Sequence, residues 1–298
     1  MHLSDQQIAQ FNDEGYLLVR GGLEDGDIDP IIAEYETYIA RRASELQTAG
    51  KISQSYAGEP FERRLASICS EDSEIYRELD IMHFRGRACF EFLANDNLLD
   101  LVEGLVGSEI TCSPIQHTRP KLPAGLTPGG SDAHVVPWHQ DAGVTWEEAD
   151  PHFILTVWLP LSSSTEENGC LEIIPRTHGC GLWQHHSKKG VGTTIVDGEM
   201  PEEDIAVLPM EKGDVLLMHK EIPHRSRGNN SQVIRWSMDL RYQATGTPTG
   251  RPFHPDFVVR SEADPDSVLK DYDEWCRLWI EGLAQKPTRS AHRWQVVE

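Results

Sequence analysis

The sequence lacks a long apolar run, a paired-cysteine motif and an excess of basic residues. No stretch approaches the roughly 20 apolar residues of a membrane-spanning helix, which excludes a helical membrane protein. Residues 1–11 are polar and do not predict a secretory signal. The six cysteines are scattered without a CxxC pair, so they form no disulfide framework. We therefore expect a reducing, cytoplasmic location.

Basic residues are scarce, because 27 Lys and Arg stand against 48 Asp and Glu, a formal net charge of -21. Such a chain offers no counter-charge to phosphate backbones or anionic lipids, so we expect neither nucleic acid nor a membrane as a partner. Repeats and linker-like segments are also absent. With 298 residues, 39% of them hydrophobic, the chain can bury a full core. We expect one domain over residues 1–298 and a small-molecule substrate; the oligomeric state is unknown from the sequence.

Hydrophobic spacing predicts helices first and strands after them. Helical spacing covers residues 5–14, about 27–47 and about 86–106, and returns at 264–283. Strand-like runs cover 16–19, 110–119, 153–159, 170–174, 214–219 and 233–242. Residues 50–65 and 176–204 show neither pattern and are expected to be irregular. This order predicts a mainly β core wrapped by flanking helices.

One short motif suggests a metal site. His139 and Asp141 are two residues apart, so on a strand both side chains would face the same side. A third ligand must come from elsewhere, and His224 and His219 both offer an imidazole. Two histidines and one carboxylate leave coordination positions open, as in non-haem Fe(II) oxygenases.

This chemistry also requires a cation near the metal site. A 2-oxo acid such as 2-oxoglutarate would take two of the open positions and dioxygen the last. The far carboxylate of 2-oxoglutarate is costly to bury without a cation, which Arg235 can supply. Ser226 can add a hydroxyl donor. Alternation over 233–242 places Arg235 on one face with Asp239 and Arg241. That face lines a polar cavity or is simply exposed to solvent; this strand alone leaves both open.

With these residues the chain resembles the phytanoyl-CoA dioxygenase family. The similarity is carried by the runs 137–142, 155–159, 167–171, 174–179 and 213–216, and by His224, Ser226, Asn229 and Arg235. The resemblance implies a double-stranded β-helix, or cupin-like jelly roll, over about 110–245. The helical N-terminal part and the C-terminal helix would pack on it.

The resemblance also implies the cofactors and the roles of particular residues. The cofactors are Fe(II), 2-oxoglutarate as co-substrate, and O2. The implied iron ligands are His139, Asp141 and His224, with Arg235 and Ser226 on the far carboxylate. The residues implied beside the co-substrate are Gln116, Thr156 and Trp158. Because Asp141 is present, the resemblance does not extend to the halogenases, which lack that carboxylate.

The expected function is that of a dioxygenase that hydroxylates an unactivated C–H bond of a small organic molecule and releases succinate and CO2. The substrate-wall candidates are His134, Trp138, Trp146 and Trp183, although a Trp often packs in a core instead. Two alternatives remain at this stage. A zinc-dependent hydrolase would suit the same ligands but gives Arg235 no role, and a non-catalytic cupin-like protein would merely hold a metal or ligand.

Overall fold

The computed structural model describes residues 1–126, 135–188, 192–201, 204–285, 293–294 and 296–297. Its α-helices are α1 (Asp5–Glu14), α2 (Asp25–Thr48), α3 (Phe61–Cys69), α4 (Ile81–Phe84), α5 (Arg87–Leu93), α6 (Asp96–Val106) and α7 (Tyr272–Ala284). Helix α1 begins with the capping box of Ser4 and Gln7. It ends at Gly15, whose φ of 78° favours glycine and where an added Cβ would lie 2.4 Å from Nδ1 of His178. No described helix is long and apolar enough to cross a bilayer.

The largest sheet of the described chain is antiparallel and is built around its longest strand. Its order is β1 (Tyr16–Val19), β10 (Val215–His219), β5 (Ile154–Pro160), β12 (Arg235–Ala244), β2 (Ile110–Cys112) and β13 (Phe257–Arg260). Strand β3 (His117–Lys121) also pairs with β12, at its beginning. Strand β12 therefore lies between β5 on one side and β2 and β3 on the other.

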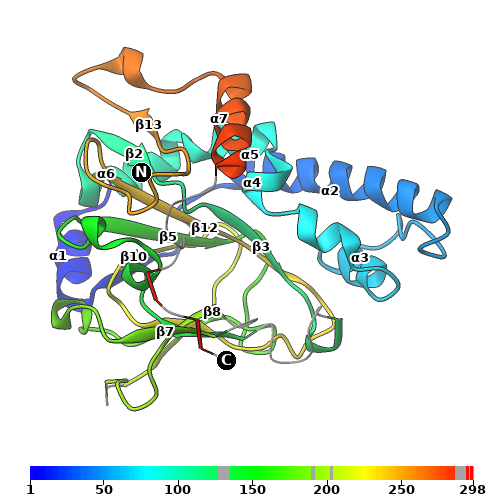
Figure 1. The fold of residues 1–298 in the computed structure, drawn as a ribbon, viewed down its shortest axis with the longest axis horizontal. Helices are drawn as coiled ribbons and strands as arrows, with labels where there is room; N and C mark the ends of the chain where they lie inside the picture. The colour runs from blue at the N-terminus through cyan, green and yellow to red at the C-terminus, as the bar shows by residue number, and fades with distance from the viewer. Residues whose placement is uncertain (127–134, 189–191, 202–203, 286–292, 295, 298) are drawn as a thin grey trace.

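A second antiparallel sheet has the order β4 (Val136–His139), β11 (His224–Ser226), β6 (Leu171–Ile173) and β9 (Ala206–Leu208). A smaller sheet contains β14 (Val296–Val297), β7 (His185–Lys188) and β8 (Gly192–Ile195), with β14 parallel to β7. The two larger sheets form the predicted double-stranded β-helix. Helices α2, α3, α5 and α7 lie on one side of the large sheet, and β7 and β8 lie on the other (Figure 1).

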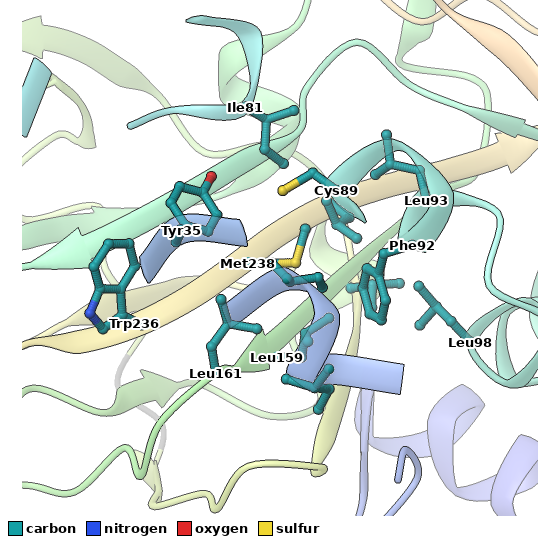
Figure 2. Close-up of a cluster of buried hydrophobic side chains, with 14 of the residues drawn as sticks. Tyr35, Ile81, Cys89, Phe92, Leu93, Leu98, Leu159, Leu161, Trp236 and Met238 are labelled. Atoms are coloured by element: carbon teal, nitrogen blue, oxygen red, sulfur yellow. The ribbon is translucent and has the colours of Figure 1, made fainter. Parts of the chain in front are cut away.

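The main apolar cluster joins the helices to one face of β12. Trp236 and Met238 of this strand are fully buried. Trp236 lies beside Tyr35 of α2, with ring centroids 5.3 Å apart, and Leu93 of α5 belongs to the same cluster (Figure 2). The Trp236 ring stacks on Phe61 with centroids 4.7 Å apart. Burial of each such side chain contributes about 1.5–3 kcal/mol to folding. Because the apolar face of β12 packs in this cluster, its charged face points toward the second sheet.

The structure differs from the predicted elements in several places. The helical run 86–106 is divided into α5 and α6, and the strand-like run 110–119 into β2 and β3. Helix α3 begins at Phe61 inside the expected loop 50–65, because Phe61, Leu65 and Ile68 form a buried stripe at helical spacing. The hairpin β7–β8 lies within the expected irregular region 176–204. Helix α7 begins only at Tyr272, since the side chain of Asp271 accepts hydrogen bonds from two amides of the first turn and caps it there.

Candidate metal centre

The second sheet brings the three predicted ligands together. His139 ends β4, His224 begins β11, and the two are direct partners across the antiparallel ladder. Asp141 does not continue the strand as expected; it opens a short 3-10 turn after the extended residue Gln140. One ligand atom from each of His139, Asp141 and His224 lies within 4.8 Å of the others. His219, the other candidate, lies apart from this group, with its ring against Phe153 and His178.

Both imidazoles are held in the tautomer that a metal requires. Nδ1 of His139 lies 2.9 Å from the carbonyl oxygen of Pro137, and Nδ1 of His224 lies 3.0 Å from that of Ile222. Because a carbonyl only accepts, each Nδ1 donates, which leaves Nε2 as the ring nitrogen that can ligate a metal. These Nε2 atoms lie 3.8 Å and 3.9 Å from Oδ1 of Asp141. Burial, followed by the nearby His224, lowers the pKa of His139 to about 3, so its imidazole is neutral at physiological pH.

The Asp141 carboxylate is oriented through both oxygens. Oδ1 accepts a hydrogen bond of 2.5 Å from Nη2 of Arg241, and Oδ2 accepts one from the hydroxyl of Thr156. Burial acts to raise the pKa of Asp141, but the Arg241 cation, with the hydrogen bond from Thr156, helps to lower it overall. The group is therefore ionised and fixed in direction. Two imidazoles and one carboxylate, buried and converging, fit Fe(II).

Arg235 lies in the same cavity as the two histidines. This cavity, of about 260 Å³, is called the triad cavity here; His139, Trp158, His224, Ser226 and Arg235 are among its lining residues. The Arg235 guanidinium is 5.1 Å from the Trp158 ring centroid, and Nη1 donates to the carbonyl of Gly169 at 3.3 Å. Within the described chain Arg235 pairs with no carboxylate, and its Nε has no partner. Burial lowers the pKa of Arg235 to about 10, which still leaves it a cation.

An unpaired buried guanidinium fits a ligand that brings its own carboxylate. Leaving such a charge without a counter-ion is costly, so the cavity favours an anion. The planar guanidinium group suits bidentate binding of a carboxylate. The Ser226 hydroxyl lines the same cavity, although here it donates to the carbonyl of Gly169 at 3.0 Å. The residues present therefore fit 2-oxoglutarate as well as iron.

The other sequence candidates fall in different places. The hydroxyl of Thr156 donates to the Asp141 carboxylate, and Thr156 does not line the triad cavity. Trp158 lines this cavity beside Arg235. Gln116 is buried outside the lining, where its Nε2 donates to the carbonyl of Ser113 at 3.1 Å. The predicted roles of Gln116, Thr156 and Trp158 toward the co-substrate stay predictions.

Three of the four substrate-wall candidates, Trp138, Trp146 and Trp183, are not among the described residues that line the triad cavity. The Trp138 ring faces away, with the Arg225 guanidinium 4.8 Å from its centroid. Trp146 packs on Phe253, with ring centroids 5.4 Å apart. The backbone amide of Trp183 donates to the side chain of Gln140. His134 lies outside the described residues. A role for these four in substrate binding stays a prediction.

Sequence reasoning assigned no role to two charged residues that complete the site. Arg241 bridges Asp141 and Asp239, donating to both carboxylates, and Asp239 lines the triad cavity. Oδ2 of Asp239 also lies 3.8 Å from Nε of Arg119. The available signal was the alternation along β12, which places Arg235, Asp239 and Arg241 on one face. The structure shows that this face lines a polar cavity.

The backbone after Asp141 is also held by distant cations. Arg251 donates from Nη2 to the carbonyl of Val144 at 2.6 Å, and Arg293 donates from Nη2 to that of Ala142, also at 2.6 Å. On the other side of the ligand, the amide of Gln140 donates to Nε2 of His185 at 3.1 Å. The segment that carries Asp141 is thus fixed from several remote parts of the chain.

Comparisons with known proteins agree with this geometry. The sequence model of the phytanoyl-CoA dioxygenase (PhyH) family matches residues 11–237. Phytanoyl-CoA dioxygenase domain-containing protein 1 of Danio rerio is 26% identical over 264 residues, covering 78% of this chain and 87% of that protein. The apo structure of the non-heme monooxygenase ThoJ superposes with a TM-score of 0.64 at 17% identity, covering 92% and 95% of the two chains.

A further solved structure is the epimerase SnoN of nogalamycin biosynthesis, in complex with Fe3+, alpha ketoglutarate and nogalamycin RO. It superposes with a TM-score of 0.56 at 18% identity, covering 83% of this chain and 86% of that one. At such identities the two structures show the shared fold. The family match spans most of the chain and includes all three ligand positions. The chain belongs to the phytanoyl-CoA dioxygenase family and is an Fe(II)- and 2-oxoglutarate-dependent oxygenase.

Proposed function

We propose that residues 1–298 act as one catalytic domain that hydroxylates an unactivated C–H bond of a small organic molecule, with release of succinate and CO2. His139, Asp141 and His224 are the proposed iron ligands. Arg235, assisted by Ser226, is the proposed partner of the far carboxylate of 2-oxoglutarate. The observation that carries the proposal is that one cavity is lined both by the two histidines of the convergent triad and by a buried guanidinium that pairs with no carboxylate in the described chain.

The chain's own residues supply geometry and charge. When bound, the iron would supply the redox chemistry that couples decarboxylation of 2-oxoglutarate to oxidation of a substrate C–H bond. Arg241 and Thr156 hold the Asp141 carboxylate so that its direction is set before any metal arrives. The Trp158 ring keeps the Arg235 guanidinium in place and excludes water from one of its faces. No side chain is required as a general acid or base.

The direct test uses the purified protein without any substrate. Anaerobic addition of Fe(II) and 2-oxoglutarate should give a weak visible charge-transfer band, and admission of oxygen should then yield succinate. A zinc hydrolase or a passive binding protein would show neither signal. An Arg235→Gln variant should lose the band at 2-oxoglutarate concentrations that saturate the wild type, and should regain it at much higher concentrations. Absence of the band in the wild type would overturn the proposal.

We also propose a cytoplasmic location and no nucleic-acid partner. The six cysteines are free, four of them buried, which suits a reducing compartment. The net charge of -21 opposes binding to a phosphate backbone. Fractionation of the cells that produce the protein, and a nucleic-acid retention assay at low salt, test these two statements.

A further inference from the structure

A second cavity, of about 420 Å³, adjoins the triad cavity. The two share three lining residues: Arg119 on β3, Val136 at the start of β4, and Arg235 on β12. Val136 lies on the strand that ends at the metal ligand His139. A molecule in the second cavity therefore borders the wall where the metal and co-substrate would be held.

The lining of the second cavity is cationic although the chain is acidic. Its ten described lining residues include the cations Arg77, Arg119, Lys121 and Arg235 and the carboxylate of Asp80. Four of these ten are Arg or Lys and one is a carboxylate, whereas the whole chain has 48 acidic and 27 basic residues. A concave, low-dielectric surface of one sign concentrates ligands of the opposite sign. The contrast singles out this cavity as a place for an anion.

The single carboxylate of this cavity offsets only part of its positive charge. Oδ2 of Asp80 lies 2.8 Å from Nδ1 of His117. Burial acts to raise the pKa of Asp80, and His117, followed by Arg119, lowers it, so this one acid is shared between the two groups. Arg77 makes no ion pair within the described part of the chain, and Arg119 has only the distant contact of 3.8 Å to Asp239. Burial, and then the neighbouring Arg235, lowers the pKa of Lys121 to about 6, so its charge at neutral pH is small. The fixed charges left for a ligand are Arg77 and Arg119, since Arg235 is assigned to the co-substrate.

We propose that the substrate of this oxygenase is an organic anion whose carboxylate or phosphate group binds in the second cavity between Arg77 and Arg119. The rest of the molecule extends past Val136 into the triad cavity, where its reacting C–H bond meets the metal centre. The two guanidinium groups arrive from different elements, the 3-10 turn Glu74–Glu78 and β3. Both can bind an anionic oxygen group bidentately. This inference rests on the proposed function, because it names the substrate class of the same site.

The test measures binding of matched probes to protein loaded with Zn(II) and 2-oxoglutarate, which cannot turn over. The probes are hexanoate with hexanamide, and hexyl phosphate with hexanol, followed by ligand-observed NMR titration. We expect at least one anion to bind ten or more times more tightly than its neutral partner. The tighter of the two anions identifies the head group. If both neutral partners bind as tightly as the anions, the inference is overturned.

Variants locate the effect within the cavity. Arg77→Gln and Arg119→Gln should each reduce the preference for the anion at least fivefold, while the affinity for 2-oxoglutarate changes less than threefold. Arg277→Gln, which removes an exposed arginine of α7 outside both cavities, should leave the preference unchanged. An anion preference that persists in both cavity variants, or that disappears when excess 2-oxoglutarate is added, would contradict the assignment.

Failure of this inference is distinguishable from failure of the proposed function. The charge-transfer band and the succinate formed without substrate depend on the triad and Arg235 alone. If both signals are present and the anion preference is missing, only the substrate class is wrong. If both signals are missing, the oxygenase proposal itself fails, whatever the probes do.

Discussion

Replacing Arg241 by Met tests whether Arg241 holds the carboxylate of the proposed metal ligand Asp141. Arg241 is 3% exposed and donates to Asp141 and Asp239, which are themselves largely buried. Met retains an unbranched apolar side chain, so most of the cost will come from two carboxylates left without their cation. Removing one partner from a buried ion pair costs about 3–5 kcal/mol. That loss is a large part of the roughly 5–15 kcal/mol by which a typical domain is stable.

The assay is urea unfolding of the metal-free protein at pH 7, with the free energy of unfolding extrapolated to water. We expect Arg241→Met to lower this free energy by about 3–5 kcal/mol. Adding Asp239→Asn should recover part of the loss, because one of the two unpaired charges is then removed. Saturating Zn(II) should stabilise Arg241→Met by more than it stabilises the wild type, since the unpaired Asp141 attracts the metal more strongly.

A matched control compares the loss of a buried arginine with the loss of an exposed one. Arg277→Met removes an exposed arginine that pairs with Glu274 and Glu281 on α7, and it should change the free energy of unfolding by no more than about 1 kcal/mol. If Arg241→Met unfolds at the same urea concentration as this control, Arg241 does not hold Asp141. If Arg241→Met folds too poorly to be measured, Asp239→Asn alone is compared with the wild type. This variant keeps the ion pair of Arg241 with Asp141 and should retain metal binding.

Three further predictions concern the co-substrate, the metal and pH. Arg235→Ala should raise the KM for 2-oxoglutarate by the roughly 2–5 kcal/mol of an unpaired buried charge, about thirtyfold or more; an unchanged KM in a succinate assay would refute the anchor role. Asp141→Ala should abolish hydroxylation coupled to succinate release, and a wild-type rate of product formation by mass spectrometry would show that the ligand assignment is wrong. Burial lowers the pKa of His185 to about 4, whereas its unfolded value is about 6.5, so between these values the unfolded state binds the extra proton. The free energy of unfolding should therefore fall as the pH drops from about 6.5 toward about 4, by at most about 3 kcal/mol from this residue, and less steeply in His185→Gln; identical slopes would contradict this.

Much of the site was predictable because its chemistry depends on local spacing. The pair His139 and Asp141 is visible as two residues two positions apart, and the face of β12 that carries Arg235 is visible as alternation. The choice of His224 over His219 came from the family resemblance, and the structure brings His224 into the group of ligand atoms. The helices and strands around the site were predictable for the same reason, because their apolar positions repeat with a fixed period.

What remained hidden was long-range pairing and side-chain direction. Arg241 meets Asp141 across 100 positions in the chain, and no local pattern reports such a contact. The placement of Trp138 was recoverable in part, because a neighbour of His139 on the same strand must face the other way. The start of α7 was also recoverable, since Asp271 is a typical cap, whereas the continuous apolar spacing suggested an earlier start. Cavities formed by distant segments, such as the one lined by Arg77 and Arg119, have no counterpart in the linear sequence.

Strand β12 contributes side chains both to the hydrophobic core and to the metal site. Trp236, Met238, Leu240 and Tyr242 belong to the main apolar cluster, whereas Arg235, Asp239 and Arg241 on the opposite face lie around the metal site. A shift of this strand's register by one residue would turn its guanidinium groups into the hydrophobic core. The same shift would remove them from the metal site. Variation among relatives that act on different molecules should therefore spare β12 and collect in the segments that border the second cavity, where new substrates can be accommodated without unfolding the enzyme.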